Sequence, residues 1–123
     1  MKVINTKFKD LQIIQQKKFK DPRGNLRETF RKKIIKWDNL IFDYATTSKK
    51  NVLRGFHFQW KFPQAKFVSV LKGKILDCVI DLRKSSKTFG KTFYIVLSDR
   101  NCKSLYIPEG FGHSYYNLEM SIS

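Results

Sequence analysis

At 123 residues the chain has the length of one domain, and its 41% hydrophobic residues, with eleven phenylalanines, are enough for a packed core. This composition excludes a disordered chain, and no apolar run is long enough to cross a membrane, so we expect a single cytoplasmic domain over residues 1–123. The net charge of +15 favours anionic partners, but the lysines are spread evenly and no RNA-binding signature is present, so nucleic acid is not an expected partner.

The first part of the chain reads as short strands separated by turns. A first strand is predicted at 11–15, and a turn at 21–24, where proline presets one backbone dihedral and glycine accepts the unusual one. A second strand follows at 25–30. Residues 31–37 remain open between a loop and a short helix, and 40–47 has the composition of a strand.

The next predicted strand, at 52–60, alternates between aromatic and polar side chains. His57 and Gln59 share one parity, and the aromatic residues share the other. The alternation predicts that the aromatic side chains pack in the core and that His57 and Gln59 lie on the opposite face. The aromatic residues in question are Phe56, Phe58 and Trp60.

The second half of the chain continues the same pattern. Further strands are predicted at 66–71, 74–82, 92–97, 104–107 and 111–118. Lys72-Gly73 predicts a two-residue hairpin, and Pro108-Glu109-Gly110 a turn that returns the last strand to the cavity. Cys78 lies on the apolar parity of its strand, so we expect it to be buried and inert. Short strands at regular spacing, with almost no helical periodicity, predict an all-β sandwich or barrel.

His57, Lys66 and Arg54 place a base and two cations close together in the chain. Histidine is a base near neutral pH, a lysine across a hairpin can stabilise an oxyanion, and an arginine fork suits a phosphate. The set fits proton abstraction beside a carbonyl of a phosphorylated or nucleotide-linked substrate, but a half-buried histidine bonded to a backbone carbonyl fits the spacing too. In a regular strand Arg54 and His57 have opposite parity, so they share a face only if Gly55 carries a bulge.

A metal site has less support in the sequence. The expected second ligand two residues after His57 would be a histidine, and that position is Gln59. His113 is the other histidine, and no carboxylate stands at ligand spacing, so we expect neither a metal nor a cofactor. His113 is interpreted either as part of a polar network in the barrel wall or as a second imidazole that contacts a ligand.

Several motifs occur in collinear order along nearly the whole chain, and together they resemble the dTDP-4-dehydrorhamnose 3,5-epimerase family. They are LRGFHFQ at 53–59, QAK at 64–66, DLRKSSKTFG at 81–90 and IPEGFGH at 107–113, with FKDPRG at 19–24 and ET at 28–29. The resemblance implies a cupin-like jelly-roll barrel and a homodimer in which the N-terminal segment reaches the partner's site. It also implies a metal-free epimerase that inverts C3 and C5 of dTDP-4-keto-6-deoxyglucose in dTDP-rhamnose and polysaccharide biosynthesis.

The resemblance also assigns roles to individual residues. His57 would be the base, and Lys66 would stabilise the enolate oxygen that forms at the C4 carbonyl. Contacts to the dTDP-linked 4-keto-6-deoxy sugar are expected from Arg23, Glu28, Arg54, Gln59 and His113. Arg23 and Glu28 would reach the nucleotide across the dimer.

The chain departs from the family pattern in two ways. The family's acid tyrosine, and the carboxylate that orients the base, come from a segment beyond Ser123, so we expect a C-terminally truncated chain with impaired activity. Tyr44 and Thr46 replace polar residues that the family uses near the nucleotide. A sugar-nucleotide ketoisomerase is an alternative, which Gln59 disfavours because those enzymes carry a second histidine; a non-catalytic sugar-nucleotide-binding protein is another.

Overall fold

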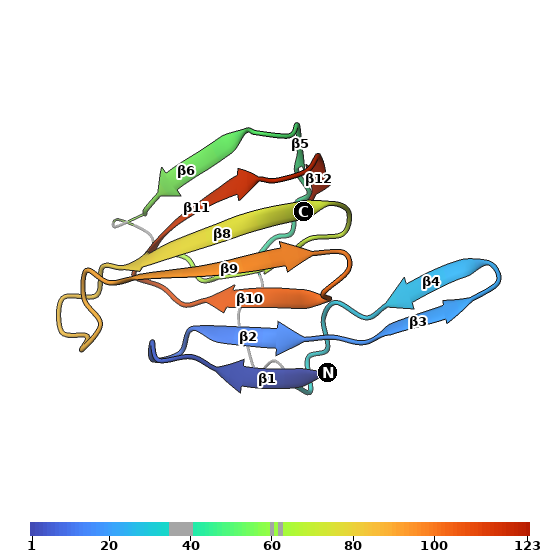
Figure 1. Cartoon of the computed structure of the whole chain (residues 1–123). Helices are drawn as coiled ribbons and strands as arrows, with labels where there is room; N and C mark the ends of the chain where they lie inside the picture. Colours follow the sequence, from blue (N-terminus) through green and yellow to red (C-terminus); the bar gives the residue numbers. More distant parts are fainter. Residues whose placement is uncertain (35–40, 60, 62) are drawn as a thin grey trace.

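The structure is a computed structural model, and it describes residues 1–34, 41–59, 61 and 63–123. These residues form twelve β-strands and no helix (Figure 1). The strands are β1 (Lys2–Asn5), β2 (Gln12–Gln15), β3 (Lys18–Asp21), β4 (Gly24–Arg27), β5 (Thr47–Ser48), β6 (Leu53–His57), β7 (Lys66–Ser69), β8 (Lys74–Asp81), β9 (Thr92–Ser98), β10 (Lys103–Ile107), β11 (Phe111–Asn117) and β12 (Ser121–Ile122). Within the described ranges, no helix meets the length and hydropathy needed to span a membrane.

Two four-stranded antiparallel sheets form the body of the molecule, in the orders β1-β2-β10-β7 and β6-β11-β8-β9 (Figure 1). The core lies between them, because buried side chains from both sheets, such as Leu105 and Ile107 on one and Ile75 and Leu97 on the other, belong to one cluster. The predicted all-β, cupin-like jelly-roll class is confirmed. The sheets form an open sandwich, and the short β5–β12 pair closes one end.

Strand β8 shows why one face of the second sheet is buried. Its residues alternate as predicted, but the face turned to the core carries Ile75, Asp77, Val79 and Asp81, all fully buried or nearly so. Cys78 lies on the other face and is still buried, as predicted, and burial raises the pKa of its thiol. Two aspartates therefore point inward, where a carboxylate must be hydrogen-bonded or must keep its proton.

The β3–β4 hairpin forms an arm that projects from the sandwich (Figure 1). Its turn is Pro22-Arg23, as predicted from the proline and glycine. Arg27 fixes the base of the arm by donating from Nε to Gln16 Oε1 and from Nη1 to the Val70 carbonyl, both at 2.8 Å. Phe19 and Leu26 face each other across the arm and remain more than 60% exposed. The arm thus carries apolar surface that the described residues of this chain leave open to solvent.

Two predictions about the strands are wrong, one about a hairpin and one about a strand. Lys72-Gly73 does not close a hairpin, because β7 pairs with β10 whereas β8 pairs with β9 and β11, so this turn carries the chain from one sheet to the other. Of the strand predicted at 40–47, residues 41–46 are irregular. Backbone pairing with the end of the chain begins at Thr46, which exchanges hydrogen bonds with Ser123, and the strand itself is the two-residue β5. Residues 31–37 were expected to form a loop or a short helix, and residues 32–34 form a turn. Residues 35–37, and residue 40 of the predicted strand, lie outside the described residues.

The aromatic residues of the central strand do not pack in the core as predicted. Phe56 is 58% exposed and Phe58 is 44% exposed, and Trp60 lies outside the described residues. β6 is an edge strand, and its side chains are exposed throughout. Alternation along this edge strand therefore did not predict burial, because every side chain of β6 is exposed.

Candidate active site

The central feature of the site is a bulge in β6 at Gly55. His57 lies opposite His113 on β11 and Arg54 lies opposite Tyr115, so three steps along β6 match two along β11. Gly55 has a φ of 109°, and a Cβ placed there would lie 2.5 Å from the carbonyl oxygen of His113. The bulge that the sequence required is therefore present, and Arg54 and His57 share a face, because their partners Tyr115 and His113 have the same parity on β11.

His113 is held by a buried carboxylate. Its Nε2 is hydrogen-bonded to Oδ1 of Asp77 on the neighbouring strand β8, and both side chains are buried. The other oxygen of Asp77, Oδ2, has no hydrogen-bond partner among the described residues. Burial raises the pKa of the Asp77 carboxyl, against the opposing effects of His113 and Lys66. The interpretation of His113 as part of a polar network agrees with this hydrogen bond, and its contact with a ligand stays a prediction.

Lys66 enters the site from the opposite sheet. It begins β7, pairs with the core residue Ile107, and is half-buried. Burial lowers the pKa of the Lys66 ammonium group, and the negative charge of Asp77 raises it. Lys66 is therefore close enough to Asp77 to sense its charge. The strand of Lys66 does not form a hairpin with that of His57, as the sequence led us to expect, because β7 and β6 belong to different sheets.

Arg54 and Tyr115 lie opposite each other on β6 and β11. Arg54 donates from Nε to Ser48 Oγ at 2.8 Å, which holds the guanidinium beside β5. The Tyr115 ring lies 5.8 Å from the His113 ring, and its hydroxyl is 3.2 Å from Thr46 Oγ1. Gln59 follows the end of β6 and is exposed. The residues of the site thus come from four strands, β6, β7, β8 and β11, and His57 is exposed on the edge strand β6.

Two predicted ligand contacts lie away from this group within one chain. Arg23 occupies the tip of the arm, has a side chain 90% exposed, and pairs with Asp21 at 2.8 Å. Glu28 follows β4 and accepts a hydrogen bond from Nη2 of Arg31 at 2.6 Å. The structure therefore places His57 and Arg54 on the strand beside His113, and Lys66 within range of the charge of Asp77, but none of the contacts of Arg23 or Glu28 named above is to these residues.

Sequence reasoning missed Asp77 and Tyr115 as members of the site. Asp77 was visible only as a polar residue in an alternating strand, and its partner is 36 residues further along the chain. A carboxylate on the same parity as the buried Ile75 and Val79 is the one signal that could have marked it. Tyr115 carried no signal beyond its position two residues after His113.

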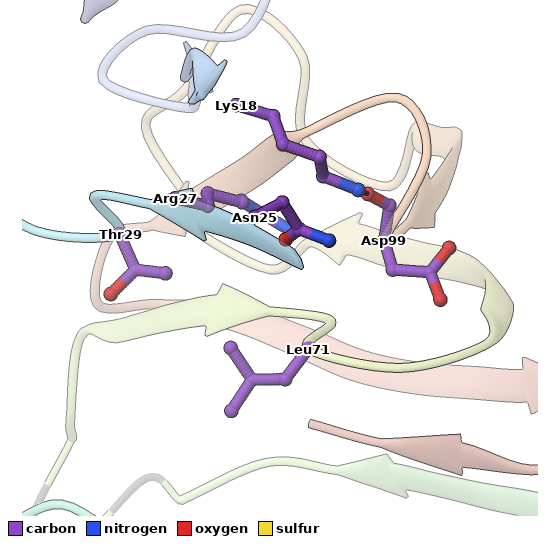
Figure 2. A pocket seen from close by; sticks show the side chains of 6 residues that line it. All are labelled: Lys18, Asn25, Arg27, Thr29, Leu71 and Asp99. Carbon is purple, nitrogen blue, oxygen red and sulfur yellow. Dashed lines mark hydrogen bonds between the residues drawn. The ribbon is translucent and has the colours of Figure 1, made fainter. Parts of the chain in front are cut away.

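A separate cleft of about 190 Å³ lies at the base of the arm. Figure 2 shows its lining, with Lys18 directed toward Asp99 and Leu71 on the facing side. The cations here are used internally: Lys18 Nζ donates to the Asp99 carbonyl oxygen, and Arg27 bonds to four acceptors. This cleft contains none of the predicted site residues, and we assign the chemistry to the group around His57.

The described part of the chain holds no group of three or more histidine, cysteine, aspartate or glutamate side chains that could bind a metal ion. At His113, the nitrogen that faces Asp77 is already used by the hydrogen bond between them.

Comparison with known proteins adds to this geometry. The family model described as dTDP-4-dehydrorhamnose 3,5-epimerase matches residues 5–122. The curated dTDP-4-dehydrorhamnose 3,5-epimerase of Methanothermobacter thermautotrophicus is 40% identical over 119 residues, which cover 94% of this chain and 64% of that protein. The Salmonella typhimurium enzyme is 40% identical over 124 residues, covering 96% of this chain and 68% of that protein. The chain thus spans about two thirds of the length of these relatives.

Solved structures agree with the sequence relatives. The dTDP-4-dehydrorhamnose 3,5-epimerase from Sulfolobus tokodaii superposes with a TM-score of 0.90 at 37% identity, over 98% of this chain and 70% of that one. A Legionella pneumophila 3,5-epimerase, solved in complex with dTDP-4-keto-L-rhamnose, gives a TM-score of 0.90 at 36% identity, over 98% and 67% of the two chains. With its fold and its sequence in agreement, the chain belongs to the dTDP-4-dehydrorhamnose 3,5-epimerase family.

Proposed function

We propose that this chain abstracts protons next to the C4 ketone of a dTDP-linked 4-keto-6-deoxy sugar, the first half of a 3,5-epimerase reaction. The observation that carries the proposal is the buried, hydrogen-bonded pair of Asp77 and His113. His57 lies opposite His113 on the neighbouring strand, and the charge of Asp77 acts on Lys66, which comes from the other sheet. Family relatives that are 3,5-epimerases, including one solved with dTDP-4-keto-L-rhamnose, support the same substrate class.

The chemistry follows from the positions of the base and the cation. Protons at C3 and C5 are acidic because the C4 carbonyl can take up the negative charge. His57 lies on the exposed edge strand β6, where a sugar can approach it. A histidine accepts a proton near neutral pH, so it can act as the base. The half-buried ammonium group of Lys66 is poorly hydrated, so its charge can stabilise an enolate oxygen more strongly than a surface lysine would.

In this proposal the remaining residues bind the substrate or hold another side chain in position. The guanidinium fork of Arg54, held by Ser48, offers donors to a pyrophosphate, with His113 beside it. Asp77 keeps the His113 ring in one orientation, because the hydrogen bond fixes Nε2. Gln59, exposed just after β6, is available to the ligand. No metal or other cofactor takes part in the mechanism we propose.

We also propose that two copies associate through the arm. A two-stranded hairpin alone is marginally stable in water, yet Phe19 and Leu26 leave it with a large apolar exposure. A second copy would cover this surface and receive Arg23 and Glu28 near its own site. Sedimentation equilibrium checks this association, and a monomer at micromolar concentration would contradict it.

A cytoplasmic setting fits the cysteines. Cys78 and Cys102 are both buried and free. Free thiols are typical of a reducing compartment. We therefore propose that the domain formed by residues 1–123 works in the cytoplasm, where its sugar-nucleotide substrate would be made.

The direct test is solvent deuterium exchange into dTDP-4-keto-6-deoxyglucose, followed by NMR. Exchange at C3 or C5 is expected with the chain as it stands, and inversion is scored separately in the same spectra. His57→Ala should abolish exchange, and Lys66→Met should lower its rate about 100-fold to 1,000-fold. Lys91→Met, which removes an exposed lysine in a loop, is the matched control and should leave the rate unchanged.

The outcomes separate the alternatives. Exchange that survives in His57→Ala would show that His57 is not the base. Absence of exchange in the unaltered chain, with nucleotide binding retained, would support a sugar-nucleotide-binding protein and reject the enzyme. Transfer of the carbonyl between carbons would identify a ketoisomerase.

A further inference from the structure

The arm formed by β3 and β4 has two unlike faces. Phe19 and Leu26 are paired across the hairpin on one face, and Lys18 and Arg27 are paired on the other. Two cations directly opposite each other in an antiparallel pair repel, so this pair weakens the hairpin unless other groups compensate for both charges. The acceptors that compensate for them belong to the sandwich, so the polar face of the arm is turned toward the body of the molecule.

Arg27 is bonded to three separate parts of the sandwich. Its Nε and Nη1 donate to Gln16 Oε1, just after β2, and to the Val70 carbonyl, just after β7, at 2.8 Å each. Its Nη2 donates longer bonds of 3.4 Å to the Lys103 carbonyl and to Ser104 Oγ, both on β10. Gln16 and Ser104 are buried and are bonded to each other at 2.8 Å. The guanidinium is thus held in a network that joins β4 to both edges of the space beneath the arm.

Lys18 ties the other strand of the arm to the sandwich. Its Nζ donates to the backbone carbonyl oxygen of Asp99, in the turn between β9 and β10 (Figure 2). Because Lys18 and Arg27 are paired, the two strands are fixed at the same level of the hairpin. Strand pairing does not support the arm further: within the described part of the chain, β3 and β4 pair only with each other. A cleft of about 190 Å³, lined by Asn25 of the arm and Leu71 of the body, lies at its base.

We propose that Arg27 and Lys18 form a clamp that sets the direction of the arm, and that both are positioning residues for the association of two copies. The inference rests on the proposed association through the arm. The clamp turns the polar face of the arm to its own sandwich, so Phe19 and Leu26 are presented outward to a second copy. An arm that is already ordered loses less conformational entropy on binding than a free one.

The length of the arm makes its tip sensitive to the clamp. Three residue pairs lie beyond Lys18 and Arg27, so the tip is about 10 Å from them. A tilt of about 20° at the clamp would move Arg23 by about 4 Å, which is more than the length of a hydrogen bond. A loosened clamp would therefore misplace both the apolar face and the tip of the arm.

The test measures the motion of the arm and the association of the chain in the same variants. Arg27→Met should lower the ¹⁵N heteronuclear NOE of the amides at the arm tip, whereas the amides of β8 should keep their values. It should also weaken self-association about 10-fold to about 100-fold in sedimentation equilibrium, because the arm must then be ordered on binding. Lys18→Met, which leaves the bonds of Arg27 in place, should have a smaller effect of the same kind.

Two controls separate the clamp from charge and from a nearby change. Arg27→Lys keeps the charge but loses the guanidinium fork, so it should loosen the arm as well, and full recovery in this variant would overturn the clamp. Arg100→Met removes an exposed arginine beside Asp99, one that pairs with Glu119, and should change neither readout.

A third measurement separates the clamp from stability. Loss of Arg27 also leaves buried acceptors unpaired, so urea unfolding is measured for every variant. If Arg27→Met does not fold, Lys18→Met decides, and an arm and an association that are both unchanged in it overturn the clamp. A loss of unfolding free energy in Arg27→Met, with no change in the arm or in association, would show that Arg27 only stabilises the fold, and it too overturns the proposal.

The clamp and the association fail separately. A monomeric chain whose arm tip becomes mobile in Arg27→Met would retain the clamp and reject the association. A dimer that forms with equal affinity in Arg27→Met and in the unaltered chain, with an equally rigid arm, would retain the association and reject the clamp.

Discussion

Replacement of Gly55 by alanine tests the bulge that aligns His57 with His113. The φ of 109° belongs to a region that residues with a Cβ rarely adopt, which costs about 1–3 kcal/mol. The new Cβ would also lie 2.5 Å from the His113 carbonyl oxygen and 2.7 Å from the Ser114 Cα, and overpacking of this kind costs about 1–3 kcal/mol. Because both neighbours are backbone atoms in a paired strand, they cannot swing away.

Gly55→Ala is therefore expected to lower the free energy of unfolding by about 2–6 kcal/mol. Gly90→Ala is the matched control: Gly90 also has a positive φ, 77°, but nothing lies within 4 Å of its Cβ position, so only about 1–2 kcal/mol of backbone strain is expected. Urea unfolding followed by circular dichroism measures both losses. If Gly55→Ala is no more destabilising than Gly90→Ala, the close approach of β6 and β11 is not what maintains the bulge.

Two further predictions concern the buried aspartates. Burial alone would raise the pKa of Asp81, but hydrogen bonds led by that from Arg83 outweigh it and hold the pKa below its ordinary value. Asp81 thus stabilises the fold above the unfolded-state pKa of about 3.9, and this contribution falls as the pH drops toward the lower native pKa. Asp81→Asn should therefore lower the free energy of unfolding by about 2 kcal/mol at pH 7. The urea midpoint of the variant should fall less steeply at acid pH than that of the unaltered chain, and an equal fall would contradict this. Asp77→Asn should lower the pKa of Lys66 further, because the charge that opposes the effect of burial is lost; a titration of the Lys66 ¹³Cε resonance that moves to higher pH would refute this reading.

Sequence reasoning could find a site residue only when the pattern that marks it lies within a few residues of the chain. His57, Lys66 and Arg54 stood in one stretch, and the need for a bulge at Gly55 followed from the parity of Arg54 and His57, which the register of β6 and β11 confirms. Asp77 could not be assigned, because its role depends on a partner 36 residues away.

The residue sequence by itself determined the strands of the second half and the turn of the arm. Alternation in β8 and β11, and the proline–glycine turn before β4, depend on neighbours a few residues apart, so they can be read locally. The tertiary structure alone decided the pairing of β7 with β10, the exposure of Phe56 and the approach of Lys66 to Asp77. These features depend on which strands meet across the core, and that is set by packing between segments far apart in the chain rather than by any local preference.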